Sequence, residues 1–375
     1  MGRRQSEGVS LTHAQIAGTG GYQPGEPIPT EKIVELAGEL PEDVAAGLSI
    51  EQRYWLADIE TGAHRENNSD MAVKAAERAL ESAGTGADEI DFIFQATGTP
   101  DYVLPPVVNL VQERLGIEKC ATLEIRSAGA GWVQGLDLAR MYIEQGAYKQ
   151  GLVIGSEAIS PVLVPSFLGK DPAKIRIRDR LPLYMFGDGA GAAVVKASED
   201  GQGMIGGAMR AIGGSRKAGI HVVGGGTHAP LHEQQAAEKL ADLRVDAVGA
   251  GDFTPVMVTE ALADVLERTG IDVNTIDHCL IPEGNVGWML DSLREAGLMT
   301  PMWTALEDKI FDNLSQSGAC GCAAVPLFAD HAWRNGLIQP GQRVMLIGVE
   351  ATKWIYAGLV LDWTAARPSN GRDAA

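Results

Sequence analysis

The sequence feature that most constrains the fold is an internal repeat at a fixed offset. The segment Leu80-Glu81-x-x-Gly84, followed by Ile90-Asp91, recurs as Leu266-Glu267-x-x-Gly270 followed by Ile276-Asp277. From 80 to 266 and from 90 to 276, the offset is 186 residues, about half of the 375-residue chain. Solenoid repeats have periods of about 20–50 residues, so this spacing indicates duplication of a whole domain.

Each copy of the repeat has the pattern of a helix, a turn and a strand. The apolar-periodic stretch ends in both copies at a glycine, Gly84 or Gly270, which suits the left-handed residue that closes a helix. The expected helices cover 71–83 and 256–269, and the expected strands cover 90–94 and 276–281.

The two copies continue in parallel. A strand at 121–125 leads into the small-residue turn 127–131, and a similar turn at 317–321 opens the matching helix in the second copy. Later apolar strands are expected at 151–154, as an edge strand, and at 344–347. Alternating helices and strands predict mainly parallel sheets covered by helices.

We therefore expect an α/β fold with two pseudo-symmetric halves in a five-layered αβαβα arrangement. The halves are expected at 1–198 and 199–375, with tails at 1–10 and 367–375.

Composition excludes several classes of protein. Hydrophobic residues make up 45% of the chain and charged residues 21%, as in soluble globular proteins. A formal charge of −18 argues against nucleic acid and anionic membrane as partners. Four cysteines are too few for a disulfide framework, and no long apolar span occurs, so we expect a soluble cytoplasmic protein.

Several motifs occur in an order that resembles one known family. The segment 186–192 reads Phe-Gly-Asp-Gly-Ala-Gly-Ala, and its small residues allow two backbones to approach closely. Other landmarks are Leu104-Pro105-Pro106, Gly224-Gly225-Gly226-Thr227, Ile281-Pro282 and Pro340-Gly341-Gln342. In this order they resemble the thiolase superfamily, in its β-ketoacyl-acyl-carrier-protein synthase III (KAS III) branch, over nearly the whole chain.

The resemblance implies a thiolase-like fold and a Cys-His-Asn triad, but the triad residues are absent here. The family's cysteine lies two residues before a glycine-aromatic pair, here Gly131-Trp132, which places Gly129 at its position. Glu283 follows Ile281-Pro282 where the family has histidine, and Ala319 stands where it has asparagine. A covalent ketosynthase cycle through a cysteine is therefore not expected.

The resemblance also implies a substrate pocket. The family's triple-glycine turn, which supplies an oxyanion-hole amide, corresponds to Val349-Glu350-Ala351. Leu104 stands where a large residue of the family reaches into the partner subunit's acyl pocket, so a homodimer is expected. Trp132 and Gly129 are expected near the oxyanion site.

Three residues are candidates for the chemistry that the cysteine would perform. Glu283 is favoured as a base, because a carboxylate in an apolar pocket at a strand end has a raised pKa, although a solvated glutamate is the alternative. Ser127 is a weaker candidate nucleophile, since no motif places a base beside it. Three interpretations of Cys320 are open: a nucleophile, a metal ligand together with Cys322, or a small packing residue. Packing is favoured.

Other polar residues have weaker interpretations. His221, His228 and His232 lie in a glycine-rich stretch and are read as loop or core residues rather than metal ligands, so no metal is expected. A run of basic residues is unusual in an acidic chain. It indicates either a docking site for an anionic carrier or a solvated loop. Its members are Lys170, Lys174, Arg176, Arg178 and Arg180.

Two functions remain open from the sequence. The first is an acyltransferase or condensing enzyme of secondary metabolism that acts on acyl-CoA or on an acyl carrier protein. The resemblance implies no cofactor, because coenzyme A or phosphopantetheine enters as the substrate's carrier. The second is a catalytically silent subunit that forms a heterodimer with an active KAS III-like chain.

Overall fold

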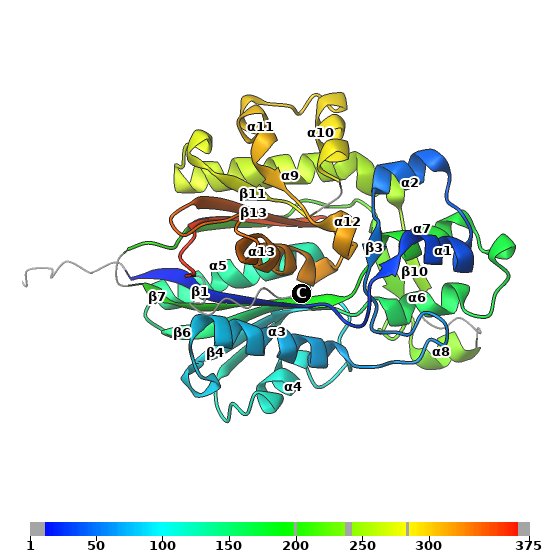
Figure 1. Ribbon diagram of the computed structural model, residues 1–375, viewed down its shortest axis with the longest axis horizontal. Helices are drawn as coiled ribbons and strands as arrows, with labels where there is room; N and C mark the ends of the chain where they lie inside the picture. The colour runs from blue at the N-terminus through cyan, green and yellow to red at the C-terminus, as the bar shows by residue number, and fades with distance from the viewer. Residues whose placement is uncertain (1–11, 199–200, 237–241, 283–284, 367–375) are drawn as a thin grey trace, which may run out of the picture.

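Two five-stranded sheets form the centre of the computed structural model (Figure 1). It describes residues 12–198, 201–236, 242–282 and 285–366. The first sheet has the order β1-β7-β6-β4-β5. Its strands are β1 (His13–Tyr22), β4 (Phe92–Ala96), β5 (Ala121–Ile125), β6 (Gln150–Glu157) and β7 (Gly189–Ser198).

The second sheet repeats the first. Its order is β12-β11-β13-β14-β8. Its strands are β8 (Met204–Ala211), β11 (His278–Leu280), β12 (Ile310–Phe311), β13 (Arg343–Glu350) and β14 (Ile355–Asp362). In the first sheet β5 with β4 and β4 with β6 pair in parallel, whereas β6 with β7 and β7 with β1 are antiparallel. In the second sheet β12 with β11 and β11 with β13 pair in parallel, whereas β13 with β14 and β14 with β8 are antiparallel. The expectation of mainly parallel sheets was therefore wrong, whereas the matching topology agrees with the repeat.

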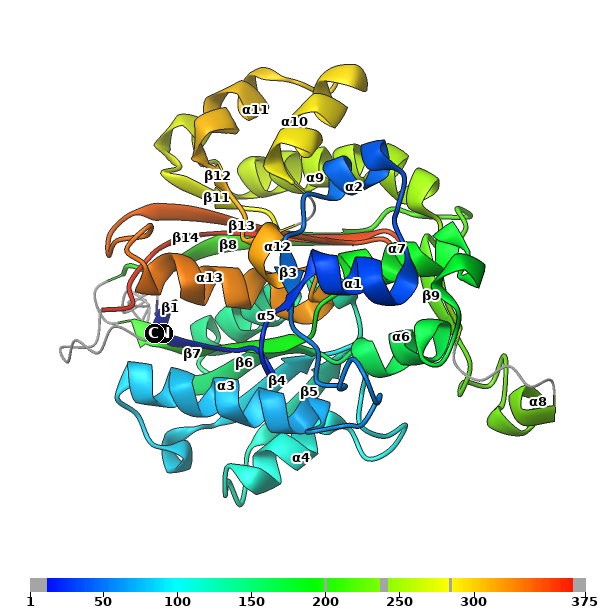
Figure 2. The same cartoon turned by 45° about the vertical axis from the view of Figure 1, so that its right-hand side comes forward.

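Helices separate and cover the two sheets, as Figures 1 and 2 show. The helices α5 (Gly131–Glu144) and α13 (Ala324–Arg334) lie between the sheets. Outside the first sheet lie α3 (Asn68–Ala83) and α4 (Val107–Arg114), and outside the second lie α9 (Ala247–Thr269), α10 (Val286–Glu295) and α11 (Pro301–Leu306). These layers confirm the thiolase-like α/β fold that the sequence predicted. Gly84 and Gly270 close α3 and α9 in the left-handed region, also as predicted.

A group of short elements covers one end of both sheets, at the right of Figure 1. Its helices are α1 (Thr30–Ala37), α2 (Glu42–Leu48), α6 (Ser160–Phe167), α7 (Ile177–Met185), α8 (Leu231–Ala236) and α12 (Leu314–Ser317). Two small antiparallel ribbons accompany them, β2 (Ile28–Pro29) with β3 (Gln52–Arg53), and β9 (Ile220–Val223) with β10 (Asp242–Val245). We call this group the cap. The tails expected at 1–10 and 367–375 lie outside the described residues.

The core between the sheets depends on close backbone contacts at glycines. Gly187 lies against α12, where a Cβ would be 2.2 Å from the carbonyl oxygen of Ser317. Gly191 lies against Pro326 of α13 at a Cβ distance of 2.7 Å. Since real Cβ atoms never approach backbone this closely, the small residues of 186–192 have the role that the sequence predicted.

The edge of the first sheet differs from the expected one. Residues 151–154 belong to β6, which pairs with β4 and β7 and so lies inside the sheet. The edges are β1 and β5, and the segment before α4, a helix that packs on β5, carries three exposed apolar side chains: Tyr102, Val103 and Leu104. Of the described helices, none is long and apolar enough to cross a membrane.

Asp188 connects the first sheet to the cap. Its buried carboxylate accepts hydrogen bonds from Leu56 N at 2.8 Å and Ile159 N at 2.6 Å. It also accepts bonds from the backbone N–H and hydroxyl of Ser160, the first residue of α6. Burial raises the pKa of Asp188 to about 6, against the effect of these donors.

We expect Asp188→Asn to lower the free energy of unfolding by about 2–3 kcal/mol, because the amide would turn an N–H toward a buried donor. Urea unfolding monitored by circular dichroism measures this loss. Asp88→Asn, at an exposed position of a 3-10 helix, is the matched control and should stay within about 0.5 kcal/mol. Equal stability of the two variants would contradict this role for Asp188.

Candidate functional site

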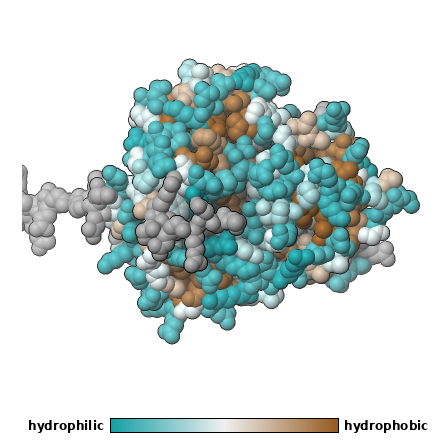
Figure 3. Space-filling view, in the orientation of Figure 1, coloured by the Kyte–Doolittle hydropathy of each residue, from teal (hydrophilic) through white to brown (hydrophobic). Residues whose placement is uncertain are grey.

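A cavity of about 1150 Å³ opens where the parallel strands of both sheets end beneath the cap. The strand ends contribute Arg126, Glu157, Pro282 and Glu350 to its wall. Carboxyl ends of strands are where α/β sheets place their ligand sites. The cap contributes mainly apolar residues: Val44, Leu48, Val162, Leu181, Val222, Leu243 and Val245. Figure 3 shows apolar patches among the hydrophilic residues at this end of the molecule.

Gly129 lies in the wall of this cavity, on the 3-10 turn η2 (Ala128–Ala130). The residue before it, Ala128, has a φ of +35°, which is strained for a residue with a side chain. The turn presses on β13, since a Cβ at Gly348 would lie 2.3 Å from the carbonyl oxygen of Gly129. A strained, tightly held turn is therefore present at this position, although Gly129 has no side chain to react.

The second turn places Ala319 in the cavity wall but turns its cysteines away. Cys320 and Cys322 are fully buried and are absent from the cavity wall. The Cys320 thiol faces the carbonyl oxygens of Ser317 and Gly318 at 3.4 Å. Burial, with nearby carboxylates, raises the pKa of both thiols, which disfavours a thiolate nucleophile at Cys320. These contacts agree with packing residues.

Two other candidates lie away from the cavity wall. Ser127 is half-buried beside Gly129 but is not among the residues that line the cavity. Trp132 is fully buried in the core between the sheets, where its indole N–H donates to Val153 O at 3.0 Å. Leu104 is 78% exposed on the surface of this chain, while its neighbour Val103 lines the cavity.

Glu350 lines the cavity, but its carboxylate is occupied by its own turn. It accepts hydrogen bonds from the backbone N–H groups of Thr352 at 2.6 Å, Lys353 at 3.2 Å and Ile355 at 3.1 Å. The turn that joins β13 to β14 is therefore fixed by a glutamate side chain. Its neighbour Ala351 also lines the cavity.

Glu283, the favoured base, lies outside the described residues. Pro282, directly before it, belongs to the cavity wall. The assignment of Glu283 therefore depends on its sequence position and stays a prediction.

Sequence reasoning missed Glu157, a buried carboxyl group in the same wall. It ends β6 and is 5% exposed. It accepts hydrogen bonds from Gly98 N at 3.0 Å, from the Thr99 hydroxyl at 2.5 Å and from Cys322 N at 3.2 Å. Burial raises the pKa of Glu157 above its usual range. The signal in the sequence was a glutamate at the end of an otherwise apolar strand.

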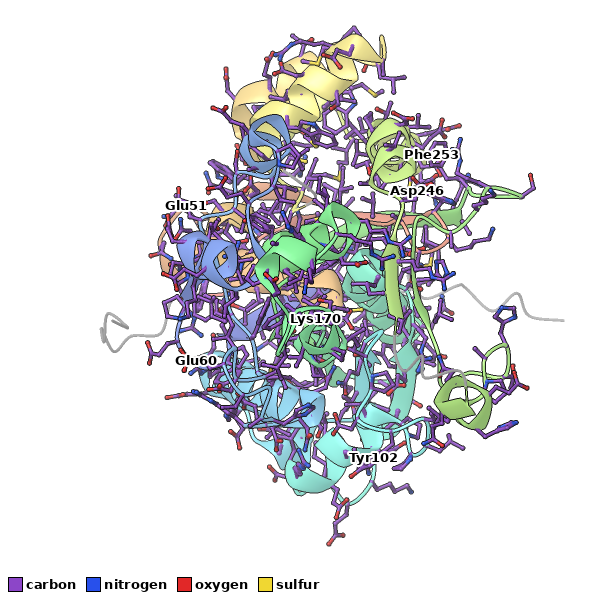
Figure 4. The ribbon with its side chains drawn as sticks, turned by 90° about the vertical axis from the view of Figure 1, so that its right-hand side faces the viewer. Glu51, Glu60, Tyr102, Lys170, Asp246 and Phe253 are labelled. Atoms are coloured by element: carbon purple, nitrogen blue, oxygen red, sulfur yellow. The ribbon has the colours of Figure 1, made fainter. Side chains whose placement is uncertain are left out.

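The basic run is divided by the structure. Arg180 donates to Glu39 O at 2.7 Å and Pro172 O at 2.9 Å, so it holds the cap together. The other four side chains are exposed, and Asp171 and Asp179 form ion pairs with three of them: Lys174, Arg176 and Arg178. Figure 4 shows Lys170 near the middle of the face that the cap presents.

The histidines of the glycine-rich stretch do not gather. His221 is exposed on β9 and lines the cavity, whereas His232 is on α8 beside Glu233. Within the described ranges, no three side chains among His, Cys, Asp and Glu form a group that could hold a metal ion.

Comparison with known proteins identifies the family. Residues 123–213 match the 3-oxoacyl-[acyl-carrier-protein (ACP)] synthase III family, and residues 266–363 match its C-terminal domain. β-Ketoacyl-[acyl-carrier-protein] synthase III of Caldanaerobacter subterraneus subsp. tengcongensis is 30% identical over 351 residues, which cover 94% of this chain and 98% of the relative. The chain belongs to the KAS III family. It is thus a KAS III-like member of a family of condensing enzymes.

Solved structures agree with this fold. The 3-oxoacyl-(acyl carrier protein) synthase III of Pseudomonas aeruginosa PAO1 superposes with a TM-score of 0.77 at 22% identity, over 95% of this chain and 100% of that chain. A tetronic acid condensing enzyme superposes with a TM-score of 0.78 at 23% identity, over 93% of this chain and 99% of that chain.

We expect the native KAS III-like chain to resist alkylation at the cysteines of its core. Cys279, Cys320 and Cys322 are fully buried with raised pKa values, whereas Cys120 is half-buried. Iodoacetamide followed by intact-mass measurement should therefore modify Cys120 at most, and Cys120→Ser should leave the native chain unmodified. Denatured protein, in which every thiol reacts, is the control. Rapid native labelling of Cys320 would contradict its packing role.

Proposed function

We propose that this KAS III-like protein transfers or condenses the acyl group of an acyl thioester without forming an acyl-enzyme. Glu283 serves as the base, and the pathway is one of secondary metabolism. The observation that carries the proposal is that Gly129 and Ala319, at two positions of the family's triad, line a large cavity without a reactive side chain. The structural similarity to a tetronic acid condensing enzyme supports this class of chemistry.

The cavity volume supports direct transfer between two bound substrates. Without a covalent intermediate, the acyl donor and the acceptor must occupy the site together. At about 1150 Å³ the cavity exceeds the range of about 300–1,000 Å³ usual for the pocket of one ligand. Its apolar cap residues suit the acyl chain and the uncharged part of the carrier arm.

The carrier is either coenzyme A or an acyl carrier protein. Lys170, Lys174, Arg176 and Arg178 are exposed on the cap and suit docking of either anionic carrier. Arg180 is not part of this docking surface, because it donates to backbone carbonyls.

We further propose a homodimer formed along β5. An unpaired edge strand needs covering, and a second copy would also shield the three exposed apolar residues before α4, the helix that packs on β5: Tyr102, Val103 and Leu104. Figure 4 shows Tyr102 in the lower part of the molecule, beside the cyan helix.

The alternative function is a silent subunit that pairs with an active KAS III-like chain. Gly129 and Ala319, which have no reactive side chain at two triad positions, favour this alternative. An ionisable residue at 283 and the large cavity favour the enzyme.

Direct transfer predicts that the chain never carries an acyl group. After incubation with acyl-CoA or acyl carrier protein, intact-protein mass spectrometry should show the unmodified mass. Initial rates with both substrates varied should follow sequential kinetics, because ping-pong patterns require a covalent intermediate. Gly129→Cys provides a comparison in which a thiol is restored. An acyl adduct on Ser127 or Cys320 of the unaltered chain would overturn the proposal.

Glu283→Gln should lower kcat by about 10²–10⁴-fold with little change in substrate binding, because it keeps the shape and removes the base. Steady-state kinetics and thioester binding by calorimetry measure the two effects. Glu295→Gln, at the end of α10, is an exposed control. If Glu283→Gln leaves the rate of an active complex within a few-fold, the silent-subunit alternative is favoured.

A further inference from the structure

Glu157 differs from the other described carboxyl groups that line the cavity. The Glu66 carboxylate is bound by Lys74 at 2.6 Å, and Asp101 accepts from the backbone and hydroxyl of Ser69. Glu350 holds its own turn, as shown above. Glu157 is likewise buried at the end of a central strand, but its hydrogen-bond donors come from other segments of the chain, Gly98, Thr99 and Cys322, and not from its own turn.

The hydrogen bonds around Glu157 determine which of its oxygens can hold a proton. The Thr99 hydroxyl oxygen accepts from Ala158 N at 2.7 Å, so its hydrogen points to Glu157 Oε1. Oε1 also accepts from Gly98 N and is therefore fully used. Oε2 accepts from Cys322 N at 3.2 Å, which leaves it the site for a proton.

Gly321 packs closely against Oε2. A Cβ at Gly321 would lie 2.5 Å from Oε2, and the residue has a φ of +48°. Gly321 itself lines the cavity, as does Glu157. A side chain at 321 would therefore collide with the oxygen that can carry the proton, and glycine keeps that oxygen next to the cavity.

We propose that Glu157 is the proton donor of this site, acting through Oε2 on the sulfur of the departing carrier thiol. The inference rests on the proposed function and adds a catalytic residue to it. The acceptor's nucleophilic atom forms a bond to the acyl carbon after losing its proton to the base that the proposed function assigns. The C–S bond breaks, its electron pair goes to sulfur, and sulfur takes the proton from Oε2. Proton exchange with solvent then restores both groups.

The surroundings of Glu157 favour its neutral form. The thiols of Cys320 and Cys322 are titratable groups close to it, and the pKa of each is raised. Burial is the largest influence and raises the pKa of Glu157. A donor with a raised pKa is active when protonated, so activity is present at lower pH and falls as pH rises through that pKa.

The test compares the pH dependence of kcat in the full-length wild type, Glu157→Gln and Ser156→Ala. Glu157→Gln should lower kcat by about 10²-fold and abolish its fall on the alkaline side. Ser156 lies next to it on the opposite face of β6, where its hydroxyl bonds Gln95 and Asn68, so Ser156→Ala should lower stability and keep the pH profile. A Glu157→Gln enzyme with the wild-type pH profile would overturn the inference while leaving the proposed function intact.

A wild type without turnover would count against the proposed function. Infrared difference spectroscopy then tests the role of Glu157 without relying on turnover. The probe is a nonhydrolysable acyl-pantetheine thioether. A protonated-carboxyl band that shifts on binding and is missing in Glu157→Gln supports the donor role. Absence of that band from the wild type at neutral pH, or a band that the probe leaves unchanged, overturns it.

Discussion

The structure depends on backbone segments of the second half that pack directly against glycines of the first. A Cβ at Gly155 would lie 2.0 Å from the carbonyl oxygen of Cys322, in addition to the contacts of Gly187 and Gly191 already described. These contacts bring the turn at 321–323 against the end of β6, and hence Cys322 N within reach of Glu157. A side chain at Gly155 would push the two halves apart and open the wall of the cavity. Site geometry and domain packing are thus one constraint.

The sequence predicted the architecture well because the repeat and its helix caps are local signals. Gly84 and Gly270 needed no tertiary information to be read as helix ends. The sequence did not predict that the last strand of each half, β7 or β14, runs antiparallel to its neighbours. β7 follows an excursion through α6 and α7 into the cap, and β14 follows a tight turn held by Glu350, so neither arrives through a crossover helix covering the sheet. Alternation of apolar segments does not distinguish these connections from parallel ones.

Some of the residues predicted for the site line the cavity, and others do not. The repeat predicts the strand ends and turns that carry Gly129 and Ala319, and both residues line the cavity. The roles of Glu350, Arg180 and Glu157 depend on which backbone groups lie nearby in space, and linear sequence does not give that information. Glu350 binds its own turn, Arg180 binds carbonyls of the cap, and Glu157 joins Gly98 to Cys322 across the halves.

Burial and the acidic groups near the turns at 128–130 and 321–323 destabilise a thiolate in this part of the molecule. Burial, and after it the nearby carboxyl groups of Glu157 and Glu350, raise the pKa of Cys322, whose sulfur would lie 3.6 Å from a Cβ at Gly131, next to the η2 turn. Asp188 and Glu157 likewise raise the pKa of Cys320. Burial next to acidic groups penalises a further anion, whether thiolate or carboxylate, and favours protonated acids. This environment suits the proposed direct transfer, in which a neutral donor protonates the carrier's sulfur as it departs.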